Sequence, residues 1–405
     1  MTFFASRWVE APGHVKELDS RLLPRGFRAA GVAAGIKPTG LDVGVLTSDE
    51  RGTVSAARFT TNARLGAPVM VTKDASLDRL RAVAANSGCS NVGDGGRGID
   101  TAIAMQAAAA EELGVQPEEV AVASTGVIGV ELPRERVTTG VRAACGVLSD
   151  DAESFSTAIL TSDAGPKRAC LEVTLPGGAV RLSAQAKGAG MISPRHATMF
   201  CFVQTDAALE EATIELLTGV CVKRSFDRIS VDGQLSTSDT VVALANGASG
   251  VRVEPESPDE LALGEALDAV LRQLALAIVH DGEGAKRVGR VVVTGGPDVV
   301  EPVARAVANS PLVKAALHGG DPNFGRILQA AGQVWPPGDP FIVDLEIEGH
   351  QVVSAGDVVE PAPAEVVQGD EVEYLLTVPG EGGETEVFFS DLSPEYVRFN
   401  AEYMS

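Results

Sequence analysis

The chain has 405 residues, of which 45% are hydrophobic and 22% charged, a balance typical of a folded globular protein. Its formal net charge of -22 argues against nucleic acid or an anionic membrane surface as a partner. No stretch of the sequence reaches the ~20 consecutive apolar residues that a membrane-spanning helix needs. We therefore expect a soluble, cytoplasmic protein of roughly two or three domains.

The cysteines and histidines argue against a disulfide framework and against a bound metal. The histidines show no HxxxH or HExxH spacing, and the cysteines form no CxxC pair. The cysteines are odd in number and scattered along the chain: Cys89, Cys145, Cys170, Cys201 and Cys221. This pattern is typical of reduced thiols in a cytoplasm.

Turn clusters alternate with apolar periodicities along the whole chain, which is typical of an α/β protein. A helix is expected over 101–113, ended by Gly114, and a short buried strand follows at 120–123. The next expected helix covers 209–222.

The strongest helix start in the sequence lies at Ser257. Ser257 is a cap residue, Pro258 occupies the first helical position, and Glu260 would complete a capping box. Apolar residues then recur at three- and four-residue steps up to Ile278, which predicts a helix with one buried face.

Two strands and a long connection are expected in the last third of the chain. A buried strand covers 291–294 and is ended by two glycines. Alternating apolar and polar residues over 341–347 predict a half-buried antiparallel strand. The segment 354–370 is expected to be a surface loop.

The stretch KGAGMISPRHATMF raises the first chemical question. Lys187 stands in a glycine-rich loop ahead of Ala197 and Thr198, and an apolar strand-like run follows. A threonine hydroxyl is a poor nucleophile, but cutting the chain before it frees an α-amino group of pKa ~7.7–8.0 that can act as its base. The small side chain of Ala197 leaves the scissile carbonyl open. The alternative is that Thr198 is an ordinary β-branched residue at the start of a strand.

Other motifs carry groups that would suit attack on a carbonyl. Thr125 and Gly126 follow the strand at 120–123 and could donate to an oxyanion, although such a turn is also a common structural feature. Lys187 could meet a carboxylate, and Glu283 in the loop DGEG could meet an amine. The sequence GGDPNFGR is a loop followed by a helix start. The nucleotide-binding patterns GxGxxG, in a strand-to-helix context, and GxxxxGK[ST] are missing.

Several blocks occur together in a fixed order and resemble one family. They are GFRAAGVAAGIK, TTNARLGAPV, STGVIG, ILTSDAGPK, KGAGM with ATM, FDRISVDGQLSTSDTVVALANG, DGEGAKR and SPLVKAALHGGDPNFGRIL. From about Leu23 to Ser405 the chain is similar to the ornithine acetyltransferase (glutamate N-acetyltransferase) family of arginine biosynthesis. These blocks are too long to agree by chance. The resemblance therefore favours Thr198 as a nucleophile over an ordinary β-branched residue at the start of a strand.

The resemblance implies an α/β fold in two domains, with a layered α-β-β-α core similar to that of self-processing amidases. It implies autocatalytic cleavage between Ala197 and Thr198. The products would be an α chain of residues 1–197 and a β chain of residues 198–405, which stay associated as an α2β2 heterotetramer.

The resemblance also implies the chemistry and the residues that carry it out. Thr198 would take the acetyl group from N-acetyl-ornithine and pass it to glutamate in a ping-pong reaction. Thr125 and Gly126 match the oxyanion hole. The substrate-binding positions are Thr161, Lys187, Thr198, Glu283, Asn400 and Ser405. No metal and no organic cofactor are implied, and the sequence leaves open whether acetyl-CoA is also a donor.

The chain departs from the family pattern next to the scissile bond, where Arg195-His196 replaces the usual Asn-Met pair. Two alternatives therefore stay open. One is an N-terminal-threonine amidase or aminopeptidase, in which water resolves the acyl-enzyme. The other is a protein on the same scaffold that binds amino acids without turnover.

Overall fold

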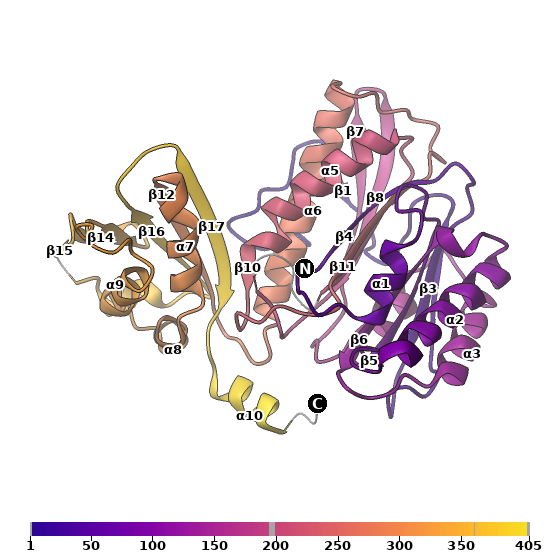
Figure 1. Ribbon diagram of the computed structural model, residues 1–405. Helices are drawn as coiled ribbons and strands as arrows, with labels where there is room; N and C mark the ends of the chain where they lie inside the picture. The colour runs from indigo at the N-terminus through magenta and orange to yellow at the C-terminus, as the bar shows by residue number, and fades with distance from the viewer. Residues whose placement is uncertain (1, 194–198, 360, 403–405) are drawn as a thin grey trace.

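The structure is a computed structural model that describes residues 2–193, 199–359 and 361–402. Its strands form three sheets, two of which belong to one layered core while the third forms a separate lobe (Figure 1). The strand before segment 194–198 and the strand after it both lie in the core, as neighbours in one sheet.

The first core sheet has six strands. In spatial order they are β1 (Val15–Glu17), β7 (Lys167–Leu175), β8 (Gly178–Lys187), β9 (Phe200–Thr205), β11 (Thr240–Ala245) and β4 (Val54–Phe59). The pair β9–β11 is parallel, and the other pairs are antiparallel. The second core sheet has four strands: β2 (Phe27–Val32), β3 (Val43–Ser48), β5 (Ala82–Cys89) and β6 (Val120–Val127).

The two core sheets pack face to face because their strands alternate between two apolar faces. In β9, Phe200 and Phe202 face the four-stranded sheet, whereas Cys201 and Val203 face the helices behind. The layer between the sheets combines many alanines with a few aromatic rings, and Phe155 and Phe202 lie 5.6 Å apart, centroid to centroid. Small residues let the sheets approach closely, and the rings fill the remaining space.

Helices cover the outer faces of both sheets, which gives the predicted α-β-β-α order. The four-stranded sheet carries α1 (Ala67–Lys73), α2 (Gly95–Leu113) and α3 (Arg134–Cys145). The six-stranded sheet carries α5 (Glu211–Arg224) and α6 (Pro258–His280). The short α4 (Glu153–Ala158) contributes Phe155 to the layer between the sheets.

The third sheet builds the C-terminal lobe, which is coloured orange to yellow in Figure 1 except for the pink β10. Its strands in spatial order are β10 (Ile229–Ser230), β17 (Gly383–Ser390), β12 (Val288–Gly295), β16 (Glu371–Thr377), β13 (Asp344–Ile347), β14 (His350–Ser354) and β15 (Asp357–Val358). Its helices are α7 (Pro297–Ala308), α8 (Pro311–Gly319) and α9 (Phe324–Gly332). The last helix, α10 (Pro394–Glu402), leaves the lobe and runs back below the core (Figure 1).

The predicted helices and strands are present, with differences at their ends. The helix expected from 101 begins at Gly95, and the strand expected to end at 123 continues to Val127 because it pairs in parallel with β5. The helix expected over 209–222 covers Glu211–Arg224. The strand expected at 291–294 is β12, which is longer at both ends.

Three local predictions need correction. Ser257 caps α6 by accepting from the backbone N–H of Glu260 at 3.2 Å, but the Glu260 side chain accepts from the N–H of Glu256 rather than that of Ser257. The strand expected over 341–347 is limited to β13, which begins at Asp344 and is antiparallel as predicted. The expected loop 354–370 also contains β15 and a short 3-10 turn, Ala364–Val367.

Phe202 should contribute strongly to stability through the layer between the sheets. We expect Phe202→Ala to lower the free energy of unfolding by about 3–5 kcal/mol, because it removes a ring from a fully buried, well-packed position. Urea denaturation followed by circular dichroism measures the change. Leu261→Ala is the matched control, since that side chain is 67% exposed and its loss should cost no more than ~0.5 kcal/mol. Equal losses in both variants would contradict the layered packing.

Candidate active site

The candidate site begins at the end of β6, where Thr125 and Gly126 lie next to the end of β5. The parallel register places Thr125 opposite Ser87 and Gly126 opposite Gly88. Gly126 has φ = 127°, and a Cβ added there would lie 2.5 Å from the carbonyl carbon of Gly88. Only glycine fits at this position, both for its backbone angle and for its space. The backbone at Thr125-Gly126 is therefore fixed by the neighbouring strand.

Lys187 stands at the end of β8 and is fully buried. Its Nζ donates to the hydroxyl of Thr161 at 2.6 Å and to the hydroxyl of Thr125 at 3.4 Å. Burial lowers the pKa of the Lys187 amine, and the negative charge of Asp163 opposes that effect. The sequence predicted that Lys187 binds a substrate carboxylate. In the structure its Nζ also orients the hydroxyls of two other predicted site residues, Thr125 and Thr161.

Asp163 is the residue on which this arrangement depends, and the sequence analysis assigned it no role. One carboxylate oxygen accepts from Lys167 Nζ at 2.7 Å and from the N–H of Gly188 at 2.6 Å. The other accepts from the N–H of Thr161 at 3.1 Å and lies 3.7 Å from Lys187 Nζ. Burial alone would raise the pKa of Asp163, but the two lysines outweigh it and hold the pKa well below its usual value.

Glu283 approaches the same loop from the other side. Its carboxylate accepts from the hydroxyl of Ser162 at 2.8 Å and from the side-chain amide of Asn400 on α10 at 2.7 Å. A Cβ added at Gly190 would lie 2.5 Å from Glu283 Oε1, so the carboxylate rests directly on the glycine-rich loop. Glu283 itself has φ = 33°, an unusual angle for this residue type and one that occurs often at functional sites.

The loop that carries Glu283 is tied to the loop that carries Asp163. Asp281 accepts from Lys167 Nζ at 2.5 Å and from the N–H of Ala164 at 3.0 and 3.1 Å. Burial raises the pKa of Asp281, against the charge of Lys167. Lys167 therefore joins two carboxylates. The sequence signal for both is that Asp163 lies within the motif ILTSDAGPK and Asp281 within the motif DGEGAKR.

The structure thus brings together Thr125, Gly126, Thr161, Lys187, Glu283 and Asn400, which come from five separate parts of the chain. The remaining predicted site residues, Ala197, Thr198 and Ser405, lie outside the described residues. Within the described ranges, no group of three or more His, Cys, Asp or Glu is arranged to hold a metal ion. Nor does any described helix have the length and apolar character to cross a membrane.

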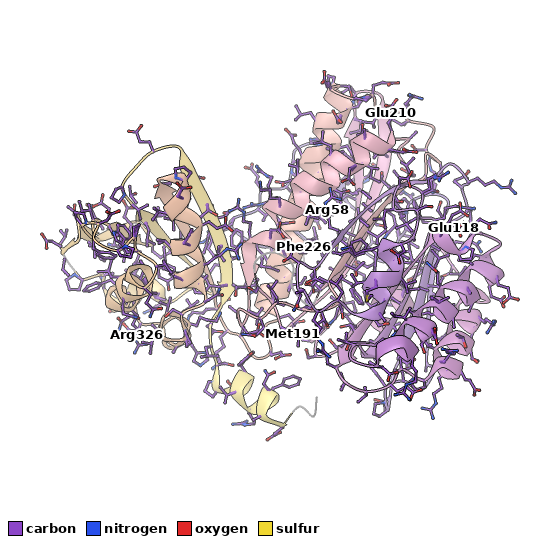
Figure 2. The ribbon with its side chains drawn as sticks, viewed as in Figure 1. Arg58, Glu118, Met191, Glu210, Phe226 and Arg326 are labelled. Carbon is purple, nitrogen blue, oxygen red and sulfur yellow. The ribbon has the colours of Figure 1, made fainter. Side chains whose placement is uncertain are left out.

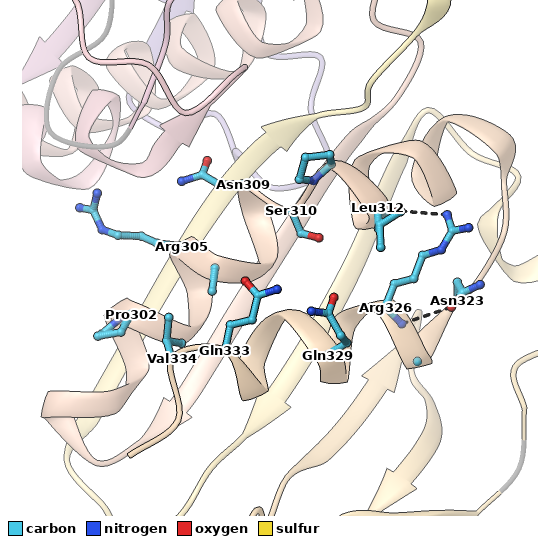
Figure 3. Close-up of a pocket in the computed structure, with 13 residues that line it drawn as sticks. Pro302, Arg305, Asn309, Ser310, Leu312, Asn323, Arg326, Gln329, Gln333 and Val334 are labelled. Atoms are coloured by element: carbon cyan, nitrogen blue, oxygen red, sulfur yellow. Dashed lines mark hydrogen bonds between the residues drawn. The ribbon is translucent and has the colours of Figure 1, made fainter. Parts of the chain in front are cut away.

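The surface hollow drawn in Figure 3 lies elsewhere, in the C-terminal lobe between α7, α8 and α9. It has a volume of about 750 Å³ and carries Arg305 and Arg326 at opposite ends. None of the predicted site residues that the structure describes lines it. The clustering of polar groups around Lys187, rather than the hollow, marks the candidate site.

The Asp163 interactions predict a specific pH dependence of stability. Because folding lowers the pKa of Asp163, its contribution is complete above the unfolded pKa of ~3.9 and is lost as the pH falls toward the folded pKa. We expect Asp163→Asn to lower the free energy of unfolding by about 3–5 kcal/mol at pH 7, because the buried Lys187 loses its nearby carboxylate and Lys167 keeps only Asp281.

Urea denaturation of both proteins between pH 8 and pH 3 measures this difference. It should be constant from pH 8 to about 5 and shrink below ~4, as the wild-type carboxylate becomes protonated. A difference that grows on acidification would contradict the assignment of Asp163 as the charged partner.

The chain as a whole is similar to known proteins of one family. Residues 28–405 match the model of the ArgJ family. A protein of Symbiobacterium thermophilum named arginine biosynthesis bifunctional protein ArgJ is 42% identical over 391 residues, covering 94% of this chain and 97% of its own. The ArgJ protein of Dehalococcoides mccartyi is 38% identical over 390 residues, covering 94% and 96%. A crystal structure of ornithine acetyltransferase from Mycobacterium tuberculosis, complexed with ornithine, is 33% identical, covers 44% of this chain and 98% of its own, and has a TM-score of 0.41.

Proposed function

This chain belongs to the ArgJ family and is an acetyltransferase of arginine biosynthesis, and on that premise we propose a reaction and a set of residues that carry it out. The reaction is transfer of an acetyl group from N-acetyl-ornithine to glutamate. The observation that carries the proposal is the family match over residues 28–405. The matched range contains the residues of the buried cluster around Lys187. The alternative of an amidase or aminopeptidase is not favoured, since the relatives that match 94% of the chain are named arginine biosynthesis proteins.

In the proposed maturation step, Thr198 Oγ attacks the carbonyl carbon of Ala197. The hydroxyl proton passes to the Thr198 nitrogen as the C–N bond breaks, which leaves an ester and a free amine. Water then hydrolyses the ester and releases the Ala197 carboxylate. The backbone at Thr125-Gly126 and the hydroxyl of Thr125 would stabilise the developing oxyanion.

In the proposed transfer, Thr198 Oγ attacks the acetyl carbonyl of N-acetyl-ornithine, and its proton passes through the new α-amino group to the departing amine of ornithine. The amine of glutamate then attacks the acetyl ester, and the proton it loses returns to Thr198 Oγ. Glu283 suits the cationic side chain of ornithine, since it is the carboxylate at the edge of the cluster, held by Ser162 and Asn400.

We propose that the α chain, residues 1–197, and the β chain, residues 198–405, stay together after cleavage and assemble as α2β2. The sheet pairing supports the first part. Residues 182–187 of β8 pair with residues 200–205 of β9, so each product would contribute strands to the middle of one buried sheet. Separating them would break this sheet and expose its core.

The threonine carries the acetyl group itself, so the proposal needs no metal and no organic cofactor. The relatives' name "bifunctional protein" favours acetyl-CoA as a second acetyl donor, which release of free CoA would test. We also place the enzyme in the cytoplasm, where amino-acid biosynthesis supplies its substrates.

The first experiment is intact mass spectrometry of the purified protein under denaturing conditions, followed by assay with N-acetyl-ornithine and glutamate. We expect two fragments that meet at Ala197 and Thr198 in place of one 41.8 kDa chain, and N-acetylglutamate as product.

Thr198→Ala should abolish both cleavage and transfer because one hydroxyl serves both steps. Thr198→Ser keeps the hydroxyl and should retain both at lower rates. Acetyl transfer by the alanine variant, or acetate as the sole product of the wild type, would overturn the proposal.

Glu283→Ala should separate the two activities. We expect KM for N-acetyl-ornithine to rise about 10- to 100-fold through loss of a charge-assisted contact, while self-cleavage continues, because the ornithine amine is absent during maturation. Steady-state kinetics and the fraction cleaved are measured on the same preparation. A variant that stays uncleaved yet binds N-acetyl-ornithine normally would contradict this division of roles.

A further inference from the structure

The chain immediately before segment 194–198 is held by a single carboxylate. The backbone N–H of Met191 donates to Asp232 Oδ2 at 2.6 Å, and that of Ile192 donates to Oδ1 at 2.8 Å. The carbonyl of Ile192 accepts in return from the N–H groups of Val231, Asp232 and Gly233, at 2.9, 3.2 and 3.2 Å. Met191 has φ = 56°, a left-handed backbone angle that costs roughly 1–2 kcal/mol and persists only where the surroundings impose it.

A second carboxylate holds the chain immediately after that segment. The N–H of Met199 donates to Asp239 Oδ1 at 3.0 Å, and the carbonyl of Met199 accepts from the N–H of Thr240 at 3.2 Å. Asp239 is buried, and its Oδ2 has no hydrogen-bond partner among the described residues. A buried unpaired carboxyl oxygen is costly, and such groups in proteins often serve a function.

Both carboxylates belong to one short segment, 231–240, that no part of the acetyl-transfer chemistry uses. We propose that this segment is a template for self-cleavage, in which Asp232 and Asp239 are positioning residues that fix the chain on both sides of the scissile peptide. The inference rests on the proposed maturation at Ala197-Thr198 and deepens it. Intramolecular attack requires the hydroxyl and the carbonyl carbon to be held within reach, and fixing both flanks reduces the freedom that would separate them.

Asp232 also connects the upstream flank to the C-terminal helix. The hydroxyl of Tyr396 on α10 donates to Asp232 Oδ2 at 3.2 Å, and Asn400, one turn further along α10, donates to Glu283. Figure 2 shows Met191 at the lower edge of the core, near α10. The template therefore forms together with the substrate side of the site, so a chain whose C-terminal helix has not docked lacks part of it.

The two aspartates respond differently to an isosteric amide, which gives the inference a sharp test. Both oxygens of Asp232 accept hydrogen bonds, from Met191 and Tyr396 on one and from Ile192 and Gln234 on the other. In Asp232→Asn one of them becomes an NH2 group that faces other donors, whichever way the amide turns.

At Asp239, Oδ1 accepts from the N–H of Met199, and the side-chain hydroxyls of Ser236 and Thr60 also interact with the carboxyl group. Burial raises the pKa of Asp239 well above its usual value. Asp239→Asn keeps the acceptor for the Met199 N–H and should be tolerated, whereas Asp239→Ala removes it.

The experiment follows cleavage of the full chain in cell-free synthesis, with the cleaved fraction read over time by denaturing mass spectrometry. We expect Asp232→Asn and Asp239→Ala to cleave at least about 10-fold more slowly than the wild type, and Asp239→Asn within about 3-fold of it. Asp206→Asn is the matched control: Asp206 is buried at the opposite end of β9, and its two oxygens accept from the N–H groups of Arg181 and Arg25. It should cleave at the wild-type rate, and circular dichroism checks that each variant is folded.

The outcomes separate this inference from the proposed function. If the wild type cleaves and Asp232→Asn keeps pace with it, the template is wrong and the acetyltransferase proposal stands. The template is equally wrong if Asp206→Asn is as slow as Asp232→Asn, because the effect is then a general loss of stability. Should Asp232→Asn fail to fold, the pair at 239 decides, and equal rates for its Asn and Ala variants would overturn the inference. An uncleaved wild-type chain would remove the maturation step and the template with it.

Discussion

The structure depends on one constraint: β8 and β9 are adjacent antiparallel strands, so the chain must leave the sheet at Lys187 and re-enter it at Phe200. The polar groups of the candidate site that the structure describes gather around this connection. Asp163 accepts from the N–H of Gly188 at its start, and the Glu283 carboxylate rests on Gly190. The sheet fixes both ends of the connection at Lys187 and Phe200.

Buried charge is the second feature that gives the site its character. The chain carries a net charge of -22, yet its candidate site is built around two buried lysines, Lys167 and Lys187. Both are close to Asp163, whose carboxylate is also fully buried. Such a group is stable only as a complete set, because removing one member leaves an uncompensated charge in a low-dielectric interior. Within this set, Lys187 holds the hydroxyls of Thr125 and Thr161 in fixed positions. Transition-state stabilisation requires such fixed donors.

Local patterns predicted most elements but not their ends. The cap at Ser257 and the alternation in β13 are short-range features, and both are present. The extension of β6 to Val127 could not be predicted, because it depends on pairing with β5, more than thirty residues earlier in the chain. The helix predicted from 101 missed the residues 95–100 for a different reason: the glycines around Gly95 locally favour a loop.

The sequence by itself determined the fold class, the family and the residue types of the candidate site, because each is written in contiguous motifs such as STGVIG, ILTSDAGPK and DGEGAKR. Only the tertiary structure decided which groups face each other: Asp163 between its two lysines, and Asp232 and Asp239 on the flanks of segment 194–198. The sequence shows where a carboxylate stands in the chain but not which groups it contacts. Its partners come from strands and loops far away in the chain, and burial then determines whether it is ionised, neutral or hydrogen-bonded.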